Sequence, residues 1–448
     1  MIYNNILEVI GNTPLVKINK LNPNPKVLIL AKLEFLNPGG SIKDRIGITM
    51  LQKAKSEGRI KKGGTIVEPT SGNTGVGLAI ASAIYGYKCV FVMPDKMSEE
   101  KRNLLRAYGA KVNVTPTAVT PQDPRSYYQV SDRLSKQNDS FKPDQYSNAA
   151  NTEAHYKSTG PEIWRDTEGK VTHVVIGMGT GGTITGVGKF LKKKNPKIKI
   201  IGVDPVGSVY LDYFKTGKLP NIFKTYKVEG VGEDFLPKTM NFSVVDDVIA
   251  VSDKESFNSA RQLAREEGIL AGGSSGMALA AAIKLAKKIK KGLVVVILPD
   301  TGRNYLSKFY NDDWMRDFGF LEEDIETIKP FLNKKLHLIT VSSKASPQEA
   351  IDLMRKYQIS QMPVVDKQKV VGTITEAILI KALFGKEKVP ISVSEIMEKD
   401  FAQLKENASI NQLVKALSQK EMVIIVDKSR KPIDVLTRID LLSHMSKI

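Results

Sequence analysis

The stretch Pro38-Gly39-Gly40-Ser41-Ile42-Lys43-Asp44-Arg45 places a single lysine at a glycine-rich turn that opens a helix. The two glycines permit a sharp turn and the serine can cap, while residues 46–58 carry the apolar spacing of a helix. A lysine held at such a turn can act as a reactive amine and form a Schiff base. Because a lysine in a first helical turn is more often a solvated surface residue, this interpretation depends on the rest of the chain.

Two more glycine-rich loops lie further along. One is Glu68-Pro69-Thr70-Ser71-Gly72-Asn73-Thr74-Gly75, and the other is Gly177-Met178-Gly179-Thr180-Gly181-Gly182-Thr183. Each follows an apolar run, and the backbone N–H groups of such loops bind anions where a helix begins. Three loops of this kind predict one anionic cofactor.

Strands and helices are predicted to alternate along most of the chain. Early examples are strands at 26–34, 65–68, 89–93 and 111–114, with helices at 76–81 and 99–108. This alternation predicts an open α/β sheet, in which ligands lie beyond the carboxyl ends of the strands. All three glycine-rich loops fall at such positions.

Composition limits the class of protein. The chain has 448 residues, 42% apolar and 25% charged, which is typical of a soluble globular protein with two or three domains. No apolar run approaches the length of a membrane span, and residues 1–5 lack the basic start of a signal peptide. We therefore expect a cytoplasmic protein without a membrane partner.

The single cysteine and the basic charge exclude further classes. Cys89 alone cannot form an intramolecular disulfide or a Cys₄ metal site, and we predict no metal. The net charge of 66 − 48 = +18 favours polyanions. However, the lysine runs at 192–194 and 287–291 end predicted helices, where cations suit the helix dipole. No nucleic-acid motif accompanies the charge, so we predict no nucleic-acid partner.

Together, the lysine turn and the two glycine-rich loops resemble the β-family of pyridoxal-phosphate enzymes, fold type II, which contains the cysteine synthases and the cystathionine β-synthases. The resemblance covers nearly the whole chain. It implies a catalytic domain of two open, twisted α/β subdomains and pyridoxal 5′-phosphate as the cofactor. It also implies a lyase that carries this cofactor on Lys43.

The third loop has a competing interpretation. Gly177, Gly179 and Gly182 satisfy G-x-G-x-x-G after a strand, and Asp204 ends a later strand, as in dinucleotide-binding folds. The family's phosphate loop, however, reads Gly-Thr-Gly-Gly-Thr, which residues 179–183 match. Because a dehydrogenase has no use for the other two loops, we expect pyridoxal phosphate rather than NAD.

The resemblance also implies roles for individual residues. The cofactor phosphate is expected at Gly179, Thr180, Gly181, Gly182 and Thr183, and the ring 3′-oxygen at Asn73. Ser274 is expected to face the pyridine nitrogen, although its spacing fits a helix N-cap equally well. The residues expected to hold the amino-acid substrate are Thr70, Ser71, Thr74, Gln145 and Tyr146.

An acidic stretch near residue 322 leads into an internal repeat. Residues 345–351 correspond to 408–414, and 363–366 to 424–427. Each copy predicts a helix, two strands and a helix, and the pair resembles tandem CBS modules, which bind adenosyl ligands. The predicted domains are a catalytic domain at 1–320, a linker at 321–335 and a tandem CBS module at 336–448.

The second repeat alone has the pair of residues that commonly holds a ribose in CBS modules. These are Thr437 and Asp440, whereas the first copy has Ile378 at the place of the carboxylate. We predict at most one adenosyl site, with S-adenosylmethionine as the first candidate and AMP or ATP as alternatives. A pair that only packs and dimerises is the other interpretation.

Several features resemble the cystathionine β-synthases more than the cysteine synthases, namely Tyr146, Ala154-His155-Tyr156, the segment 303–309 and the CBS pair. Two features depart from the animal enzymes. Ten residues precede Gly11 and none is Cys or His, so we expect no haem. Glu233 stands where those enzymes have Tyr, and it is expected either to attract the ammonium of homocysteine or to be a solvated loop carboxylate.

The activity that the resemblance implies is the condensation of L-serine with L-homocysteine to cystathionine and water, with Lys43 as acid and base. Alternatives at the same site are an O-acetylserine-dependent relative, a cysteine synthase, and release of hydrogen sulfide from cysteine. A different class is a catalytically idle sensor of adenosyl ligands. We expect a homodimer or a higher homo-oligomer.

Overall fold

The computed structural model describes residues 2–70, 72–95, 97, 99–116, 119–120, 122–137, 139–220, 224–321, 327–332, 338–384, 390–427 and 429–445. The chain divides into two compact units, Met1–Leu321 and Glu322–Ile448. No helix within these described ranges is long and apolar enough to cross a membrane.

The first unit contains a six-stranded sheet in the order β1-β2-β10-β7-β8-β9. Only β1 runs antiparallel to its neighbour. The strands are β1 (Leu15–Lys17), β2 (Val27–Leu33), β7 (His173–Gly177), β8 (Lys199–Pro205), β9 (Asp247–Val251) and β10 (Gly292–Leu298).

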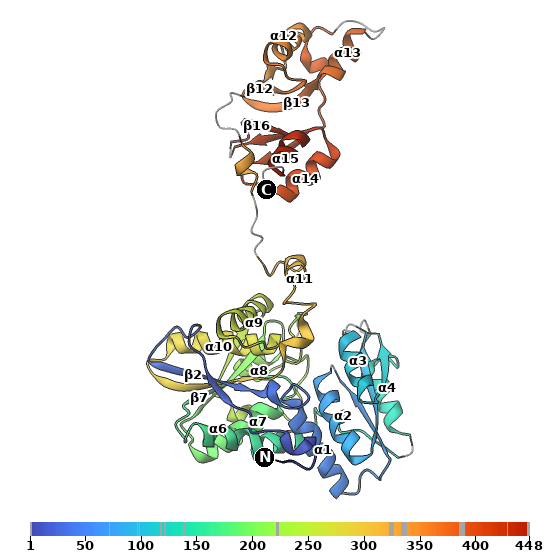
Figure 1. The fold of residues 1–448 in the computed structure, drawn as a ribbon, viewed down its shortest axis with the longest axis vertical. Coiled ribbons are helices and arrows are strands. Elements are labelled where there is room, and N and C mark those ends of the chain that lie inside the picture. Colours follow the sequence, from blue (N-terminus) through green and yellow to red (C-terminus); the bar gives the residue numbers. More distant parts are fainter. Residues whose placement is uncertain are drawn as a thin grey trace. The chain divides into compact units, whose positions relative to one another are not determined.

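Both faces of this sheet are covered, as expected for parallel strands with continuous apolar runs. Along β10, Val294 and Val296 belong to one core with α9 (Asp253–Glu267) and α10 (Gly273–Lys288). The alternate residues Val295 and Ile297 belong to a second core with the opposite helices. Figure 1 shows α9 and α10 on one side of the sheet and α6 and α7 on the other. These opposite helices are α6 (Gly160–Asp166), α7 (Gly182–Lys194) and α8 (Tyr210–Thr216).

A second, four-stranded parallel sheet has the order β5-β4-β3-β6. Its strands are β3 (Thr65–Pro69), β4 (Lys88–Pro94), β5 (Lys111–Thr115) and β6 (Ser140–Phe141). It shares a core with the early helices. The helices around it are α1 (Lys43–Ser56), α2 (Asn73–Tyr85), α3 (Glu99–Ala107), α4 (Tyr127–Ser135) and α5 (Ala149–Ala154). The two sheets form two subdomains, and the predicted alternation of strands and helices is confirmed.

The second unit contains the predicted repeat. Its sheets have the orders β11-β12-β13 and β14-β15-β16. Ser346 with Glu349 and Ser409 with Gln412 form equivalent capping boxes at the first helix of each copy. The first copy has β11 (Val341–Ser342), α12 (Pro347–Tyr357), β12 (Gln361–Asp366), β13 (Lys369–Thr375) and α13 (Glu376–Phe384). The second has β14 (Ala402–Lys405), α14 (Ile410–Gln419), β15 (Met422–Val426), β16 (Pro432–Thr437) and α15 (Arg438–Met445).

Part of the predicted linker belongs to this second unit. Ile328 is fully buried in one core with Leu413 and Ile425, and its N–H donates to the Ala408 carbonyl at 3.0 Å. Residues 327–332 therefore complete the second copy of the repeat, because Phe331 and Leu332 also pack, partly buried, against its core. A local reading of composition cannot detect this, since the partner lies some eighty residues further along the chain.

Helices α1 and α2 touch through their backbones at two glycines. A Cβ on Gly77 would lie 2.6 Å from the Lys43 carbonyl oxygen, and a Cβ on Gly47 would lie 2.4 Å from the Gly77 carbonyl carbon. Such distances are too short for any side chain, so both positions require glycine. The contact fixes the start of α1 against α2.

The substitution Gly77→Ala should therefore force the two helices apart and lower the free energy of unfolding by about 2–3 kcal/mol, as overpacking does. Urea unfolding followed by circular dichroism measures this. Ala83→Gly, at an exposed place in the same helix, reports the helix-propensity effect alone, about 1 kcal/mol. A Gly77→Ala protein as stable as the wild type would show that the close contact is not needed.

Candidate active site

One cavity of about 590 Å³ is lined by residues from both subdomains. Its lining includes most of the residues that the sequence predicts for the site: Lys43, Thr70, Asn73, Thr74, Gln145, Tyr146, Gly179, Thr180, Gly181, Thr183, Glu233 and Ser274. Gly182 begins α7 directly behind this lining, and Ser71 lies outside the described residues. The structure thus brings together segments from six separate parts of the chain.

Lys43 is the first residue of α1, and its backbone N–H donates to Ser41 Oγ at 3.2 Å. Burial lowers the pKa of the Lys43 ammonium to about 8, against the opposing charges of Glu233 and Asp300. The turn before it is held by Asp44, whose Oδ2 accepts from the Gly39 N–H at 2.5 Å. An amine with a lowered pKa is more often neutral, as a nucleophile or a proton acceptor must be.

The loop from Gly179 to Thr183 has the geometry of an anion site. Gly181 has a φ of 87°, and a Cβ on Gly179 would lie 2.7 Å from the Gly230 carbonyl oxygen. Thr180 Oγ1 accepts from Asn151 Nδ2 at 3.0 Å. The loop ends where α7 begins, so unpaired N–H groups of the first helical turn open toward the cavity.

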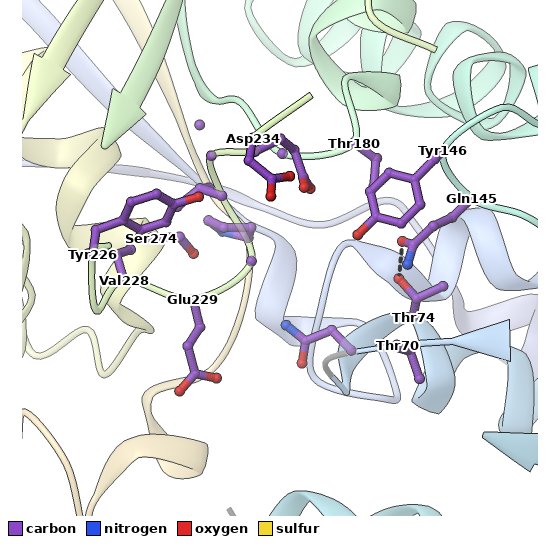
Figure 2. Close-up of a pocket in the computed structure, with 18 of the residues that line it drawn as sticks. Thr70, Thr74, Gln145, Tyr146, Thr180, Tyr226, Val228, Glu229, Asp234 and Ser274 are labelled. Atoms are coloured by element: carbon purple, nitrogen blue, oxygen red, sulfur yellow. Dashed lines mark hydrogen bonds between the residues drawn. The ribbon is translucent and has the colours of Figure 1, made fainter. Parts of the chain in front are cut away.

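The loop between β3 and α2 is braced by two threonines. Thr70 Oγ1 accepts from the N–H groups of Gly72 and Gly75 at 3.1 and 3.3 Å. Thr74 Oγ1 donates to Gln145 Oε1 at 2.7 Å, the bond drawn as a dashed line in Figure 2. Because this bond occupies the Gln145 carbonyl oxygen, the amide group of Gln145 presents donors, which suits a carboxylate ligand.

Two buried carboxylates that sequence reasoning missed hold these donors in place. Asp300 Oδ2 accepts from Asn73 Nδ2 at 2.9 Å and from the Tyr305 hydroxyl at 2.7 Å. Glu68 accepts from the backbone N–H groups of Asp144 and Gln145 at 2.8 and 3.0 Å. Both carboxylates stand at the carboxyl end of a buried strand, and that signal was available in the sequence.

The position of Ser274 in the structure decides between a helix N-cap and a residue that faces the ligand. Gly272 occupies the N-cap position of α10, and Ser274 lies inside the first turn and lines the cavity. The N-cap interpretation of Ser274 is therefore wrong. The side chain is placed where it can meet a ligand.

The part of the cavity beside the Gly179–Thr183 loop is acidic and rich in tyrosine. Figure 2 shows the Asp234 carboxylate and the Tyr146 and Tyr226 hydroxyls pointing into the space between them. Burial, and then the charge of Glu233, raise the pKa of Tyr146 well above its ordinary value. The side chain of Glu233 is half-buried and lines this cavity.

Glu229, also missed, forms ion pairs with Lys101 and Lys308 at the edge of the same cavity. Lys101 comes from α3 beside the smaller sheet, whereas Lys308 follows β10 of the larger one. Because Glu229 lies between β8 and β9 of the larger sheet, its ion pair with Lys101 joins the two subdomains. Within the part of the chain that the structure describes, no group of three or more metal-ligating side chains occurs.

Comparison with known proteins gives consistent matches. Residues 6–300 match the family described as pyridoxal-phosphate dependent enzyme, and residues 329–385 and 393–447 match the CBS domain. The chain is 40% identical to a cystathionine beta-synthase of Dictyostelium discoideum, covering 100% of this chain and 93% of that protein. It is 41% identical to a cystathionine beta-synthase of Mus musculus, covering 94% and 77%.

Solved structures also resemble the first unit. A hydrogen sulfide-producing enzyme from Fusobacterium nucleatum matches with a TM-score of 0.63 and 38% identity, covering 68% of this chain and 100% of that one. O-ureido-L-serine synthase matches with a TM-score of 0.65 and 34% identity, covering 70% and 100%.

Glu68 predicts a dependence of stability on pH. Burial raises the pKa of Glu68 from 4.5 to about 7 in the folded protein. Between these values the folded state holds a proton that the unfolded state has lost, so the contribution of Glu68 to stability falls as the pH rises. Glu68→Gln removes this titration. As the pH rises from 4.5 to 7, the free energy of unfolding of the wild type should therefore fall relative to that of Glu68→Gln, by on the order of 3 kcal/mol.

Urea unfolding at several pH values measures the effect of Glu68→Gln. Glu266→Gln, at an exposed carboxylate, is the control. Parallel stability curves for the wild type and Glu68→Gln would contradict a raised pKa.

Proposed function

The chain belongs to the cystathionine β-synthase family of pyridoxal-phosphate dependent enzymes, and we propose that it joins L-serine to L-homocysteine, giving cystathionine and water. The family matches confirm the predicted fold class, the cofactor and the CBS pair. They overturn the dinucleotide interpretation of the Gly177–Gly182 motif. The observation that carries the proposal is the meeting of Lys43, Asn73 and the Gly179–Thr183 loop around one cavity.

The residues present fit the cofactor. Asn151 Oδ1 is buried and has no hydrogen-bond partner among the described residues. A Cβ on Gly182 would lie 1.9 Å from this oxygen, so the loop has room for nothing larger than glycine at that position. Lys43 would hold the cofactor covalently, residues 179–183 its phosphate, Asn73 its ring oxygen and Ser274 its ring nitrogen. When bound, pyridoxal phosphate supplies an electron sink that stabilises charge on the substrate Cα.

Lys43 then acts as both base and acid. Its amine takes the Cα proton of serine and can give a proton to the departing hydroxyl, which leaves as water. The sulfur of homocysteine bonds to the β-carbon while its thiol proton passes to the Lys43 amine, and Lys43 then gives that proton to Cα. Thr70 and Gln145 would clamp the serine carboxylate with hydroxyl and amide donors, together with Ser71. Thr74, whose hydroxyl donates to Gln145, would orient that amide, and Tyr146 lies beside them.

A second activity at the same site is release of hydrogen sulfide from cysteine. The observation that favours it is the similarity of the first unit to a hydrogen sulfide-producing enzyme. In that reaction the leaving group is a thiolate instead of a hydroxyl, and the protein groups keep the same roles. O-acetylserine as the donor, as in an O-acetylserine-dependent cystathionine synthase or a cysteine synthase, stays a further alternative.

A substrate panel tests the proposal. Serine, O-acetylserine and cysteine are each supplied with homocysteine or sulfide, and products are identified by mass spectrometry. We expect cystathionine from serine and homocysteine, and a loss of about a thousandfold or more in Lys43→Ala, because one amine serves as anchor, base and acid. Lys53→Ala, on the exposed side of the same helix, is the control. Comparable cystathionine formation by Lys43→Ala would contradict the role of Lys43, and activity with O-acetylserine alone would contradict the serine substrate.

We propose that Glu233 binds the ammonium group of homocysteine. Its backbone is fixed, because its N–H donates to Ser208 Oγ at 3.1 Å and its carbonyl accepts from the Val209 N–H at 3.2 Å. The side chain lines the cavity. A carboxylate held there can attract a cation at the entry of the second substrate.

Glu233→Gln should accordingly raise the KM for homocysteine by roughly tenfold, with the conversion of serine alone unchanged, because the lost interaction serves only the second substrate. Steady-state kinetics with each substrate varied in turn measures this. Asp234→Asn, at the neighbouring carboxylate, shows whether the effect belongs to Glu233. An unchanged homocysteine KM would return Glu233 to the role of a loop carboxylate.

We propose one adenosyl site in the second unit, at Thr437 and Asp440. Asp440 Oδ2 accepts from the N–H and the hydroxyl of Thr437 at 2.8 and 2.6 Å. At the same place in the first copy, Thr375 Oγ1 accepts from the Ile378 N–H at 3.3 Å, and no carboxylate is present. Asp440 thus also caps its own helix, and its second oxygen is available to a ribose hydroxyl.

Calorimetric titration of the full chain with S-adenosylmethionine, AMP and ATP tests this site. We expect one of the three ligands to bind, with S-adenosylmethionine as the first candidate. Asp440→Asn should bind it about tenfold more weakly. The asparagine keeps an oxygen that accepts from the Thr437 N–H, so the helix cap is preserved. Asp366→Asn in the first copy is the matched control. Absence of binding heat with all three ligands, or unchanged binding in Asp440→Asn, would overturn the site.

We further propose a homodimer or a higher homo-oligomer. Several large apolar side chains of the second unit are exposed, Phe384 at 85% and Leu442 at 62% among them. Such side chains are commonly covered when chains associate. The cytoplasmic location stays a prediction from the sequence.

A further inference from the structure

A buried histidine stands directly behind the glycine loop. We propose that His155 is a positioning residue that turns the Thr183 hydroxyl so that its proton points at the phosphate of the cofactor. The proposal rests on the proposed function, because the anion it concerns is the cofactor phosphate at residues 179–183. His155 itself lines no part of the cavity and acts through Thr183.

Two hydrogen-bond contacts of His155 connect the protein interior to the cavity. Thr159 Oγ1 lies 2.9 Å from His155 Nδ1, and Thr183 Oγ1 lies 3.1 Å from His155 Nε2. His155 and Thr159 are fully buried, whereas Thr183 is half-buried and lines the cavity. Both nitrogens of the imidazole are therefore engaged, one by a threonine in the interior and one by a threonine at the site.

The imidazole is held rigidly. His155 begins a π-helix, His155–Thr159, that packs on α7 at Gly186, where a Cβ would lie 2.8 Å from the His155 Cβ. Thr159 is the last residue of this π-helix, and its hydroxyl lies within hydrogen-bond distance of His155 Nδ1. Neither the ring nor its two threonine partners can move far without separating this segment from α7.

The protonation state decides which groups donate. Burial, together with the positive charges of Arg45 and Lys43, holds the pKa of His155 well below its ordinary value. The ring is therefore neutral and carries one N–H. A neutral imidazole donates at one nitrogen and accepts at the other, so the two threonines must act in opposite senses.

Only one of the two tautomers suits an anion. With the proton on Nε2, Thr159 donates to Nδ1, Nε2–H donates to Thr183 Oγ1, and the Thr183 proton is left for the anion. With the proton on Nδ1, Thr183 would spend its proton on Nε2 and present lone pairs to the negative charge. The donor order Thr159, His155, Thr183 therefore stabilises a bound phosphate.

The experiment compares two ligands of the full-length apoprotein, pyridoxal 5′-phosphate and pyridoxal, which lacks the phosphate. We expect His155→Leu to raise the dissociation constant of the phosphorylated ligand about tenfold and to leave that of pyridoxal unchanged. His155→Gln, whose amide can donate to Thr183, should recover part of the loss. Thr159→Val should lose affinity by a smaller factor, and Thr167→Val, at another buried threonine, should not.

Nuclear magnetic resonance of the nitrogen-15 labelled imidazole in the loaded wild-type protein is the second readout, and we expect the proton on Nε2. Equal losses for both ligands in His155→Leu and Thr159→Val would show a merely structural histidine and overturn the proposal. Unchanged affinities in both variants, or a proton on Nδ1, would also overturn it. A wild-type protein that bound neither ligand would instead overturn the proposed function.

Discussion

The close contact between α1 and α2 is the constraint on which the site depends. Gly47 and Gly77 allow these helices to touch through their backbones, and the contact reaches the carbonyl group of Lys43 itself. Lys43 and Asn73 begin these two helices, so their side chains start from fixed and neighbouring points. A larger residue at either glycine would separate the amine from the groups that are to work beside it.

Around that contact, buried carboxylates hold the hydrogen-bond donors of the site. Asp300 holds the Asn73 amide, Glu68 holds the N–H groups of residues 144 and 145, and Asp44 holds the Gly39 turn. Burying a carboxylate is costly unless N–H or O–H groups bind it, and the groups that bind these three are those that shape the site. Oδ1 of Asp44 and Oδ1 of Asp300 are buried without a partner among the described residues. Stability and preorganisation therefore come from the same bonds. Such positioning is what a site needs when its cofactor supplies the electronic chemistry and the protein supplies orientation.

Much of this arrangement follows from the sequence, and the remainder does not for physical reasons. The glycine loops, the strands before them and the repeat after residue 340 are local patterns, so spacing reveals them. Asp300 and Asn73 form a hydrogen bond although they are 227 residues apart, and the Ile328 N–H donates to the distant Ala408 carbonyl. Only the folded chain shows these pairs. Ser274 was ambiguous because spacing alone cannot tell an N-cap from a residue inside the first turn. His155 appeared in a motif of the sequence, but its threonine partners depend on a π-helix that no periodicity predicts.

The central claim is that Lys43 is the lysine that carries the cofactor, and chemical trapping tests it most directly. The protein loaded with pyridoxal phosphate is reduced with borohydride and digested, and the modified peptide is identified by mass spectrometry. The geometry predicts one labelled lysine, Lys43, in the peptide that contains Ser41 and Ile42. Lys101 and Lys308 serve as internal controls, because Lys308 lines the same cavity and both pair with Glu229. Label on either of these lysines, or on none, would contradict the claim.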